Sequence, residues 1–399
     1  MEKNENSSAF MAERKYFGYL IFGIFLLLFT ALMVVVEIKN GRFWTNDLKV
    51  YYDATSDYFR GNNPYLKPYG LSSGFFKYPP PTLYFFWIYS KLNFFTVQII
   101  HIALSFLAFL FSVLILHKAI VGTIKENAQK KYHGILWLAF VFVAIHLVRE
   151  FHLGNINLLL LFLFVNGLFW LDRNEKWTAL SWSLLLLLKP FLLLVFLPLL
   201  FYKKWKLSLQ MAGVSIFFML LPLVLMEWSN YLDLWQYWLT AILKHGDYQV
   251  TFDSLSALFQ HYFRIKSEWA PSMLFGFIFL SIMGWTIYKN LTFSVIDWLC
   301  FFLAFSPSFF KTDTQHFILS LPLILLLLKE LINQRSWYRW SIFVLLMAGF
   351  SLNSNDLLGK NLGEWVTESG VLGISNLGLM VFFIFQKISI KKDLKTASN

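Results

Sequence analysis

The chain has 399 residues, of which 57% are hydrophobic and 14% charged, and its mean hydropathy is +0.56. Soluble globular chains carry about a quarter charged residues, so a soluble enzyme, a secreted disulfide scaffold and a disordered chain are all excluded. The net charge of +11 would suit a nucleic-acid partner, but in so apolar a chain the location of the charges decides their meaning.

Apolar runs long enough to cross about 30 Å of hydrocarbon recur along the sequence. The first, 16–36, follows a basic segment and is followed by no small-residue cleavage site, so we predict an uncleaved span. Further crossings are predicted at 97–117, 134–148, 155–171, 207–226, 272–288, 291–305, 317–332, 340–352 and 371–386. The predicted fold class is all-α: a polytopic transmembrane helical bundle of about ten full spans, with one integral membrane domain over 1–386.

The basic residues fall on segments that this scheme places on one side. They precede the first span, follow the second, precede the ninth, and recur in the tail 387–399. Lys and Arg in short loops mark the cytoplasmic side. We therefore predict a multi-pass protein of the cell membrane, surrounded by membrane lipids, with both termini in the cytoplasm and no nucleic-acid partner.

The segment 177–202 does not fit a simple crossing. Its apolar run is interrupted by Lys189-Pro190, and basic residues flank it on both sides, so both flanks should be cytoplasmic. Two half-helices of about 18 Å each would reach mid-membrane and return. We favour such a re-entrant hairpin; the alternative is one ordinary span with a proline kink and a snorkelling lysine.

Two segments predicted on the outer face, 37–80 and 227–270, are too long to be turns. Both are rich in aromatic residues, so we expect them to be ordered as short amphipathic helices along the membrane surface. The first contains Asp47, close to the end of the first span, where a carboxylate can border both a lipid head group and a water-filled cleft. The alternative for Asp47 alone is a helix cap or a solvated loop charge.

Two further polar clusters are predicted on the same face. The first has His146, Arg149, Glu150 and His152 just before Gly154-Asn155-Ile156-Asn157, and the second runs from Ser306-Pro307 through Lys311 and Asp313 to His316. Charged residues so near hydrocarbon usually face a cavity or a partner, although an interfacial anchor pair such as Arg149 with Glu150 is the alternative. A carboxylate base with cations placed for a phosphate leaving group is a coherent chemistry for these clusters.

No metal and no cofactor is expected. The histidines show no pair at the i, i+4 spacing of a helical metal motif, and the single cysteine, Cys300, excludes a cysteine cluster. Asp53 and Asp57 are four residues apart, but a like-charge pair on a solvated helix surface is the commoner explanation.

One ordered set of motifs points to a known family. The string Asp47, Tyr51-Tyr52, Ala54, Gly61, Asn63-Pro64-Tyr65, Phe76, Tyr78-Pro79-Pro80 resembles the opening signature of glycosyltransferase family 87, a GT-C-type group of membrane enzymes. Gly154-Asn155-Ile156-Asn157 is similar to a Gly-Gln-x-Asn element of that family, with Asn155 where glutamine is usual. Lys189-Pro190 and Ser306-Pro307 with His316 resemble later motifs, so the resemblance covers about residues 40–320.

The resemblance implies a polyprenyl-phosphate-linked sugar donor, most often of mannose, and inverting transfer to a lipid or glycan hydroxyl on the non-cytoplasmic face. It implies Asp47 as the base, His316 as an assisting residue and Lys189 near the donor phosphate. We expect Arg149 and Lys311 to be further phosphate-binding cations. The expected substrate-binding residues are Tyr51, Tyr52, Asn63, Tyr65, Tyr78, Asn155 and Asn157.

Two other functions stay open at this point. A lipid or glycan transporter would be expected to show broken helices in matching halves, whereas here only Lys189-Pro190 is evident. A ligase or polymerase of whole lipid-linked glycans would use similar chemistry on the outer face.

Overall fold

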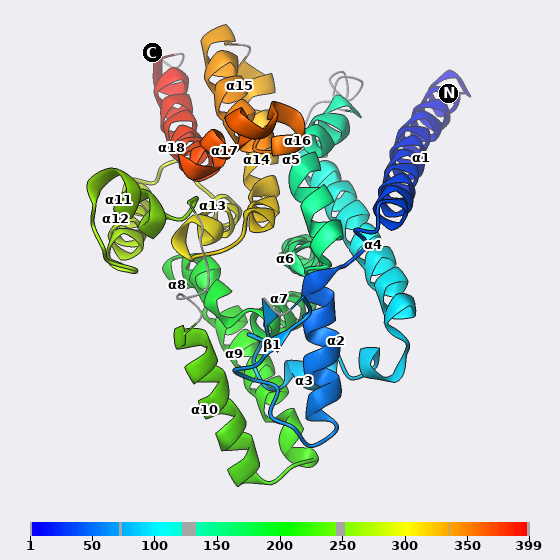
Figure 1. The fold of residues 1–399 in the computed structure, drawn as a ribbon. Coiled ribbons are helices and arrows are strands. Elements are labelled where there is room, and N and C mark those ends of the chain that lie inside the picture. The colour runs from blue at the N-terminus through cyan, green and yellow to red at the C-terminus, as the bar shows by residue number, and fades with distance from the viewer. Residues whose placement is uncertain (1, 72–73, 122–132, 245–251, 335, 397–399) are drawn as a thin grey trace.

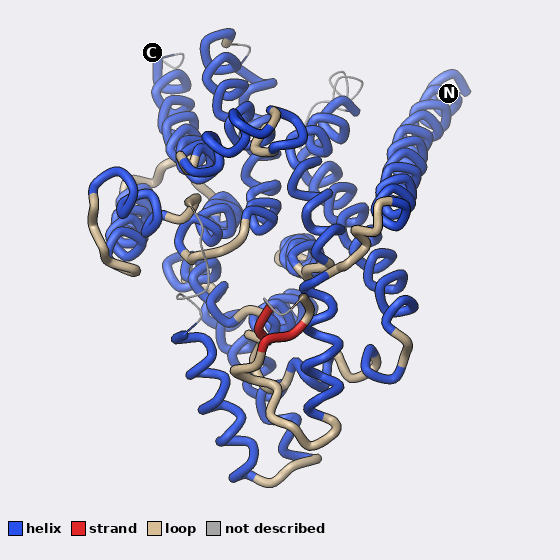
Figure 2. The backbone as a smooth tube through the Cα atoms, in the orientation of Figure 1, coloured by secondary structure: helices blue, strands red, loops and turns tan. Residues whose placement is uncertain are grey.

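The protein is almost wholly helical (Figures 1 and 2), and the computed structural model describes residues 2–71, 74–121, 133–244, 252–334 and 336–396. The long helices are α1 (Glu2–Lys39), α2 (Asn46–Tyr58), α4 (Phe94–Val121), α5 (His133–Leu153), α6 (Asn157–Trp170), α7 (Glu175–Leu188), α9 (Trp205–Leu220), α10 (Trp228–Lys244), α12 (Ala270–Tyr288), α13 (Val295–Phe309), α14 (Leu321–Gln334), α15 (Trp337–Ser351) and α18 (Val371–Thr396). The all-α polytopic fold is thus confirmed.

Shorter elements connect these helices. They are α3 (Thr82–Phe85), α8 (Leu197–Phe201), α11 (Leu255–Phe263), α16 (Asn355–Leu358), α17 (Lys360–Glu368) and the 3₁₀ helices η1 (Tyr89–Lys91), η3 (Pro190–Phe196), η4 (Leu221–Val224) and η6 (Thr314–Ser320). Two strands, β1 (Pro68–Tyr69) and β2 (Gly74–Phe75), pair antiparallel within the segment 37–80.

In the part of the chain that the structure describes, seven helices are long and apolar enough to cross a membrane. They are Phe17–Lys39, Phe94–Ala119, Gly134–Leu153, Trp205–Val224, Ala270–Tyr288, Thr314–Asn333 and Val371–Ser389. The protein is therefore a multi-pass membrane protein.

The other three predicted crossings are shorter than full spans. The helices α6, α13 and α15 have 14, 15 and 15 residues, which gives about 21–23 Å at 1.5 Å per residue. The prediction of ten full spans is wrong for these three. For α13 the reason is burial: every residue from Asp297 to Phe309 is buried, so this helix lies inside the bundle and need not match the lipid thickness.

The predicted hairpin at 177–202 is confirmed. The helix α7 ends before Lys189, and the chain then continues through η3 and α8. The Nζ of Lys206 lies 3.4 Å from a carboxylate oxygen of Glu175, so the chain enters and leaves at the same end. The rings of Trp182 and Phe196 are 4.9 Å apart, which places the second limb beside the first. The single-span interpretation is wrong, and the returning limb is mainly a 3₁₀ helix.

Ion pairs and hydrogen bonds tie the helix ends together. Lys387 on α18 contacts Asp297 on α13 at 3.2 Å and Glu330 on α14 at 3.1 Å. The segment predicted as a basic tail therefore begins as the last part of α18, with Lys387 largely buried. A second ion pair joins two other helices: His152, at the C-terminal end of α5, contacts Glu37, near the C-terminal end of α1, at 2.9 Å.

The two segments predicted on the outer face are ordered in their described residues, as predicted. The first forms α2 and the β1–β2 hairpin, and the second forms α10 and α11. On α10, Trp228, Leu232, Leu239 and Leu243 are exposed apolar residues on one side of the helix, whereas α2 packs inward through Leu48, Val50, Tyr51, Ala54 and Thr55.

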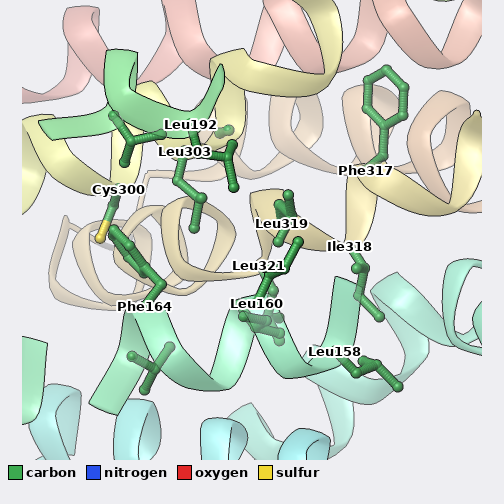
Figure 3. Close-up of a cluster of buried hydrophobic side chains, with 14 of the residues drawn as sticks. Leu158, Leu160, Phe164, Leu192, Cys300, Leu303, Phe317, Ile318, Leu319 and Leu321 are labelled. Carbon is green, nitrogen blue, oxygen red and sulfur yellow. The ribbon is translucent and has the colours of Figure 1, made fainter. Parts of the chain in front are cut away.

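A buried apolar cluster joins α6, η3, α13, η6 and the start of α14 (Figure 3). Its members include Leu158, Leu160, Phe164, Leu192, Cys300, Leu303, Phe317, Ile318, Leu319 and Leu321. Leu158 directly follows Asn157, and Phe317 directly follows His316. This core therefore fixes the backbone under the polar residues described next.

Candidate active site

The carboxylate of Asp47 lies in the first turn of α2. The N-cap of that helix is Thr45, in a left-handed conformation with φ 41° and without a side-chain capping bond. The Oδ2 atom of Asp47 instead accepts a hydrogen bond of 2.6 Å from Nδ2 of Asn155. Asp47 is thus neither a helix cap nor a solvated loop charge, and its position suits a negative charge because the N-terminus of a helix is the positive end of its dipole.

Gly154 allows α2 to approach the loop between α5 and α6. Its φ is +66°, and a Cβ on this residue would lie 2.8 Å from Cβ of Leu48 and 3.0 Å from Cβ of Thr45. Both the left-handed backbone and the close contact favour glycine. The next carbonyl, that of Asn155, accepts from Nε2 of His101 at 3.0 Å. The loop is therefore held from two sides where it contacts Asp47.

Asn157, two residues further on, connects a carboxylate to a cation. Its Nδ2 donates to Oε2 of Glu150 at 2.9 Å, and its Oδ1 accepts from Nζ of Lys189 at 2.7 Å. Glu150, Asn157 and Lys189 are all buried. The same short loop thus contacts Asp47 through Asn155 and Lys189 through Asn157.

Lys189 occupies the break of the hairpin because Pro190 prevents α7 from continuing. Its ammonium also donates to Nε2 of His316 at 2.8 Å. His316 accepts on Nε2, so its proton lies on Nδ1, which donates to the carbonyl of Asp313 at 3.1 Å. An ammonium has three N–H groups, and the bonds above use two of them.

The pKa of the Asp47 carboxyl is raised above its ordinary value, chiefly because the group is buried and also because the Asp313 carboxylate is near. Lys77, the hydrogen bond from Asn155 and Lys189 oppose this change. A carboxylate whose pKa is raised accepts a proton more readily, which is what a general base requires.

Two tyrosines line the region beside Asp47. The hydroxyl oxygens of Tyr51 and Tyr78 are 2.9 Å apart, and the Tyr65 hydroxyl donates to the Tyr78 carbonyl at 2.9 Å. Burial raises the pKa of both Tyr51 and Tyr78, and the charge of Asp47 adds to this effect. Both phenols therefore stay protonated at neutral pH and can act as hydrogen-bonding groups.

With this geometry in view, the sequence model of glycosyltransferase family 87 matches residues 75–307, more than half of the chain. The chain belongs to glycosyltransferase family 87. Neither the comparison with curated proteins nor that with solved structures gives a match.

Together with its multi-pass fold, family membership makes the protein a membrane glycosyltransferase, which uses a donor and an acceptor in the membrane. Lys77, Asn155, Asn157 and Lys189 of this glycosyltransferase lie within the matched range. Asp47 precedes the matched range and His316 follows it. The structure nevertheless joins Asp47 to Asn155, and Asn157 and His316 to Lys189, by hydrogen bonds around the 154–157 loop.

Two predicted cations of the glycosyltransferase have other partners. Arg149 donates through Nη2 to the carbonyl of Asn353 at 2.7 Å, and the Nζ of Lys311 lies 2.8 Å from the carboxylate of Glu268. No hydrogen bond among the described residues links either cation to Asp47 or Lys189. Their predicted contact with the donor stays a prediction.

The remaining predicted substrate-binding residues stabilise the first outer segment. Tyr52 donates to the carbonyl of Leu92 at 3.0 Å, and the side chain of Asn63 accepts from the backbone N–H of Tyr65 at 2.9 Å. Asn63 thus forms the turn that brings Tyr65 to Tyr78.

Three residues of this glycosyltransferase site were not among the predicted site residues. Lys77 acts electrostatically on Asp47, Glu150 holds Asn157, and His101 holds the Asn155 backbone. Their places in the sequence could have indicated two of them as site residues. Lys77 adjoins the Tyr78-Pro79 motif, and Glu150 is an acidic residue at the end of an apolar run. In the described part of the chain, no group of three or more His, Cys, Asp or Glu side chains is arranged to hold a metal.

Proposed function

We propose that the protein transfers a sugar, most simply mannose or a related hexose or pentose, from a polyprenyl phosphate to a hydroxyl of a lipid or glycan. The observation that carries the proposal is the 154–157 loop, which contacts the carboxylate of Asp47 through Asn155 and the ammonium of Lys189 through Asn157. A base for the acceptor and a cation for the leaving group are the two groups that this reaction needs.

In the proposed reaction, the acceptor oxygen attacks the anomeric carbon while Asp47 removes the hydroxyl proton. The new C–O bond forms as the bond between the anomeric carbon and the phosphate oxygen breaks, with inversion at that carbon. The electron pair of the broken bond leaves with the polyprenyl phosphate, which departs as an anion and needs no proton donor. Asp47 ends the step protonated, and its raised pKa favours that outcome.

Lys189 is the proposed contact for the donor phosphate. Two of its N–H groups are held by Asn157 and His316, which fixes the direction of the third. A fixed cation stabilises the charge that develops on the leaving phosphate without moving during the reaction. In this assignment His316 is a positioning residue, because its Nε2 lone pair is occupied by Lys189.

A lipid-linked donor also needs a place for its hydrocarbon chain. A cavity of about 370 Å³ lies between the hairpin and α9, and its apolar lining runs from Pro190, next to Lys189, to Met219. The lining also includes Leu186, Leu193, Leu197, Leu200, Met211 and Ile216. This cavity favours a polyprenyl donor over a water-soluble nucleotide sugar.

The proposal places the site on the non-cytoplasmic side, and the charge distribution supports this. The hairpin flanks Lys204 and Lys206, the loops near Arg339 and the C-terminal end of α18 are basic, and positive loops mark the cytoplasm. Asp47 lies at the opposite end of the first span from the N-terminus.

The test is transfer by the purified protein in detergent, with polyprenyl-phosphate [¹⁴C]mannose and membrane extracts as the source of acceptors. We expect a covalent product whose mass grows by one sugar, and its loss in Asp47→Asn. Asp53→Asn, on the other face of α2 and paired with Lys49 at 3.1 Å, is the matched control. Growth by a whole glycan would identify a ligase instead, and movement of the lipid in sealed vesicles without any covalent product would identify a transporter.

A further inference from the structure

Glu150 is a buried carboxylate to which the reaction above gives no task. It is 1% exposed, and it contacts two neutral donors: Nδ2 of Asn157 at 2.9 Å and the backbone N–H of Leu158 at 3.2 Å. An isolated buried charge costs several kcal/mol. An ionised carboxylate at this position is stabilised by a positive charge nearby, and the adjacent buried cation is Lys189, which interacts electrostatically with Glu150.

The orientation of the Asn157 amide follows from its two neighbours. An ionised carboxylate can only accept hydrogen bonds and an ammonium can only donate them. The NH₂ group of Asn157 must therefore face Glu150, and its oxygen must face Lys189. Were Glu150 neutral or absent, the amide would lose the partner that keeps its oxygen toward Lys189.

We propose that Glu150 is a positioning residue that, through Asn157, keeps Lys189 protonated and directs its third N–H group toward the phosphate of the donor. The inference rests on the proposed function, since it takes Lys189 as the group that receives this phosphate. The ligand chemistry is that of a phosphate monoanion or diester on a lipid.

Other charged groups face Lys189, and none of them can replace Glu150. Asp47 and Asp313 are the other nearby carboxylates, and Lys77 is a nearby cation that opposes protonation of Lys189. Asp47 must bind and release a proton in each cycle, and Asp313 contacts the Lys189 network through its backbone carbonyl on His316. The side chain of Glu150 reaches Lys189 through the two hydrogen bonds of Asn157.

The first experiment measures thermal unfolding of the ligand-free protein against pH, for the wild type, Glu150→Gln, Lys189→Met and the double variant. In Glu150→Gln the buried ammonium lacks its counter-charge, so the folded state favours the neutral amine and binds fewer protons than the unfolded state. Stability must then rise with pH. We expect the Tm of Glu150→Gln to rise between pH 6.5 and 8.5 relative to the wild type. The double variant should lack this slope, because its buried charges are both gone.

The second experiment measures binding of polyprenyl phosphate itself at the same two pH values. At pH 8.5 we expect Glu150→Gln to bind polyprenyl phosphate about tenfold more weakly than the wild type, because the protonated fraction of an amine falls about tenfold at one pH unit above its pKa. At pH 6.5 the variant should recover most of this loss. A merely structural role would weaken binding equally at both pH values. Glu227→Gln, which removes an exposed carboxylate, is the control and should match the wild type in both experiments.

The outcomes separate the inference from the function on which it rests. No pH-dependent slope in Tm, with a pH-independent loss of binding, overturns the role of Glu150. A slope in Tm for Glu150→Gln, together with unchanged polyprenyl phosphate binding in both Glu150→Gln and Lys189→Met, supports the Glu150–Lys189 pairing but overturns the assignment of Lys189 to the donor phosphate.

Discussion

Replacing Asp47 by asparagine tests the proposed base most directly. The side chain keeps its shape, and its new amide oxygen can still accept from Nδ2 of Asn155, a bond of 2.6 Å in the wild type. What it loses is the ability to take a proton. General base catalysis contributes about 10²- to 10⁴-fold, so kcat should fall by that factor, or about 3–5 kcal/mol in the barrier at 1.36 kcal/mol per tenfold. The KM for the donor should change little, because the cations on the phosphate remain.

The raised pKa of Asp47 gives the same variant a second signature. In the wild type, kcat should fall as the pH drops through a pKa above the ordinary 3.8 of aspartate, because protonation removes the base. Asp47→Asn should lack this acidic limb. A carboxyl whose pKa is raised on folding destabilises the folded protein at pH values above that pKa, so at pH 7 the variant should unfold at the same temperature as the wild type or a higher one.

The assay is initial-rate transfer with saturating polyprenyl-phosphate mannose, beside thermal unfolding of the same preparations. Near-normal turnover in a folded Asp47→Asn protein would remove Asp47 from the mechanism. A large fall in the Tm of Asp47→Asn would mean that the lost activity reflects damaged structure. A large loss of turnover in Asp53→Asn instead would identify Asp53 as the base.

Three further predictions follow from other parts of the molecule. Gly154→Ala should destabilise the protein by about 1–3 kcal/mol and lower turnover, since its Cβ would meet α2 at 2.8 Å, whereas Gly213→Ala, with nothing within 4 Å, should be neutral or stabilising in the same unfolding assay. Lys387→Met leaves two largely buried carboxylates unpaired and should cost about 3 kcal/mol, whereas Lys206→Met, on a pair whose lysine is 78% exposed, should cost less than about 1 kcal/mol; equal losses in chemical denaturation would contradict this ranking. In a variant without the native cysteine, Asn62→Cys should react with an impermeant maleimide in intact cells and Lys206→Cys only after permeabilisation; the reverse pattern would invert the proposed orientation.

Charge and hydropathy predicted the architecture well where each helix faces lipid. The basic flanks of the 177–202 segment predicted the hairpin, because positive charges stay on one side of a membrane whatever lies between them. The same rules overestimated α6, α13 and α15, which are apolar but shorter than a lipid span. An apolar helix buried inside the bundle, such as α13, has the composition of a lipid-facing one, so the sequence cannot distinguish them. For α15, which exposes much of its surface, burial does not account for the shorter length.

The site was predictable as a list of residues but not as a set of contacts. Asp47 and Lys189 came from their motifs, yet the bond from Asn155 to Asp47 spans 108 residues and depends on how α2 packs. Arg149 and Glu150 show that neighbours in the sequence need not contact each other in the structure. They are sequence neighbours and were considered a pair, but consecutive residues of a helix do not face each other. Arg149 donates to the backbone carbonyl of Asn353, and Glu150 accepts from the side chain of Asn157.

The 154–157 loop also sets the order in which the site can assemble during synthesis. Asp47 is synthesised early, and its partner Asn155 follows 108 residues later. Lys189 in turn precedes its partner His316 by 127 residues. Chains grow from the N-terminus at about 5–20 residues per second, so α2 waits several seconds beside an incomplete bundle. A nascent chain that ends before His316 thus carries the base, the loop and the cation, yet it lacks one of the two acceptors that hold the cation in place.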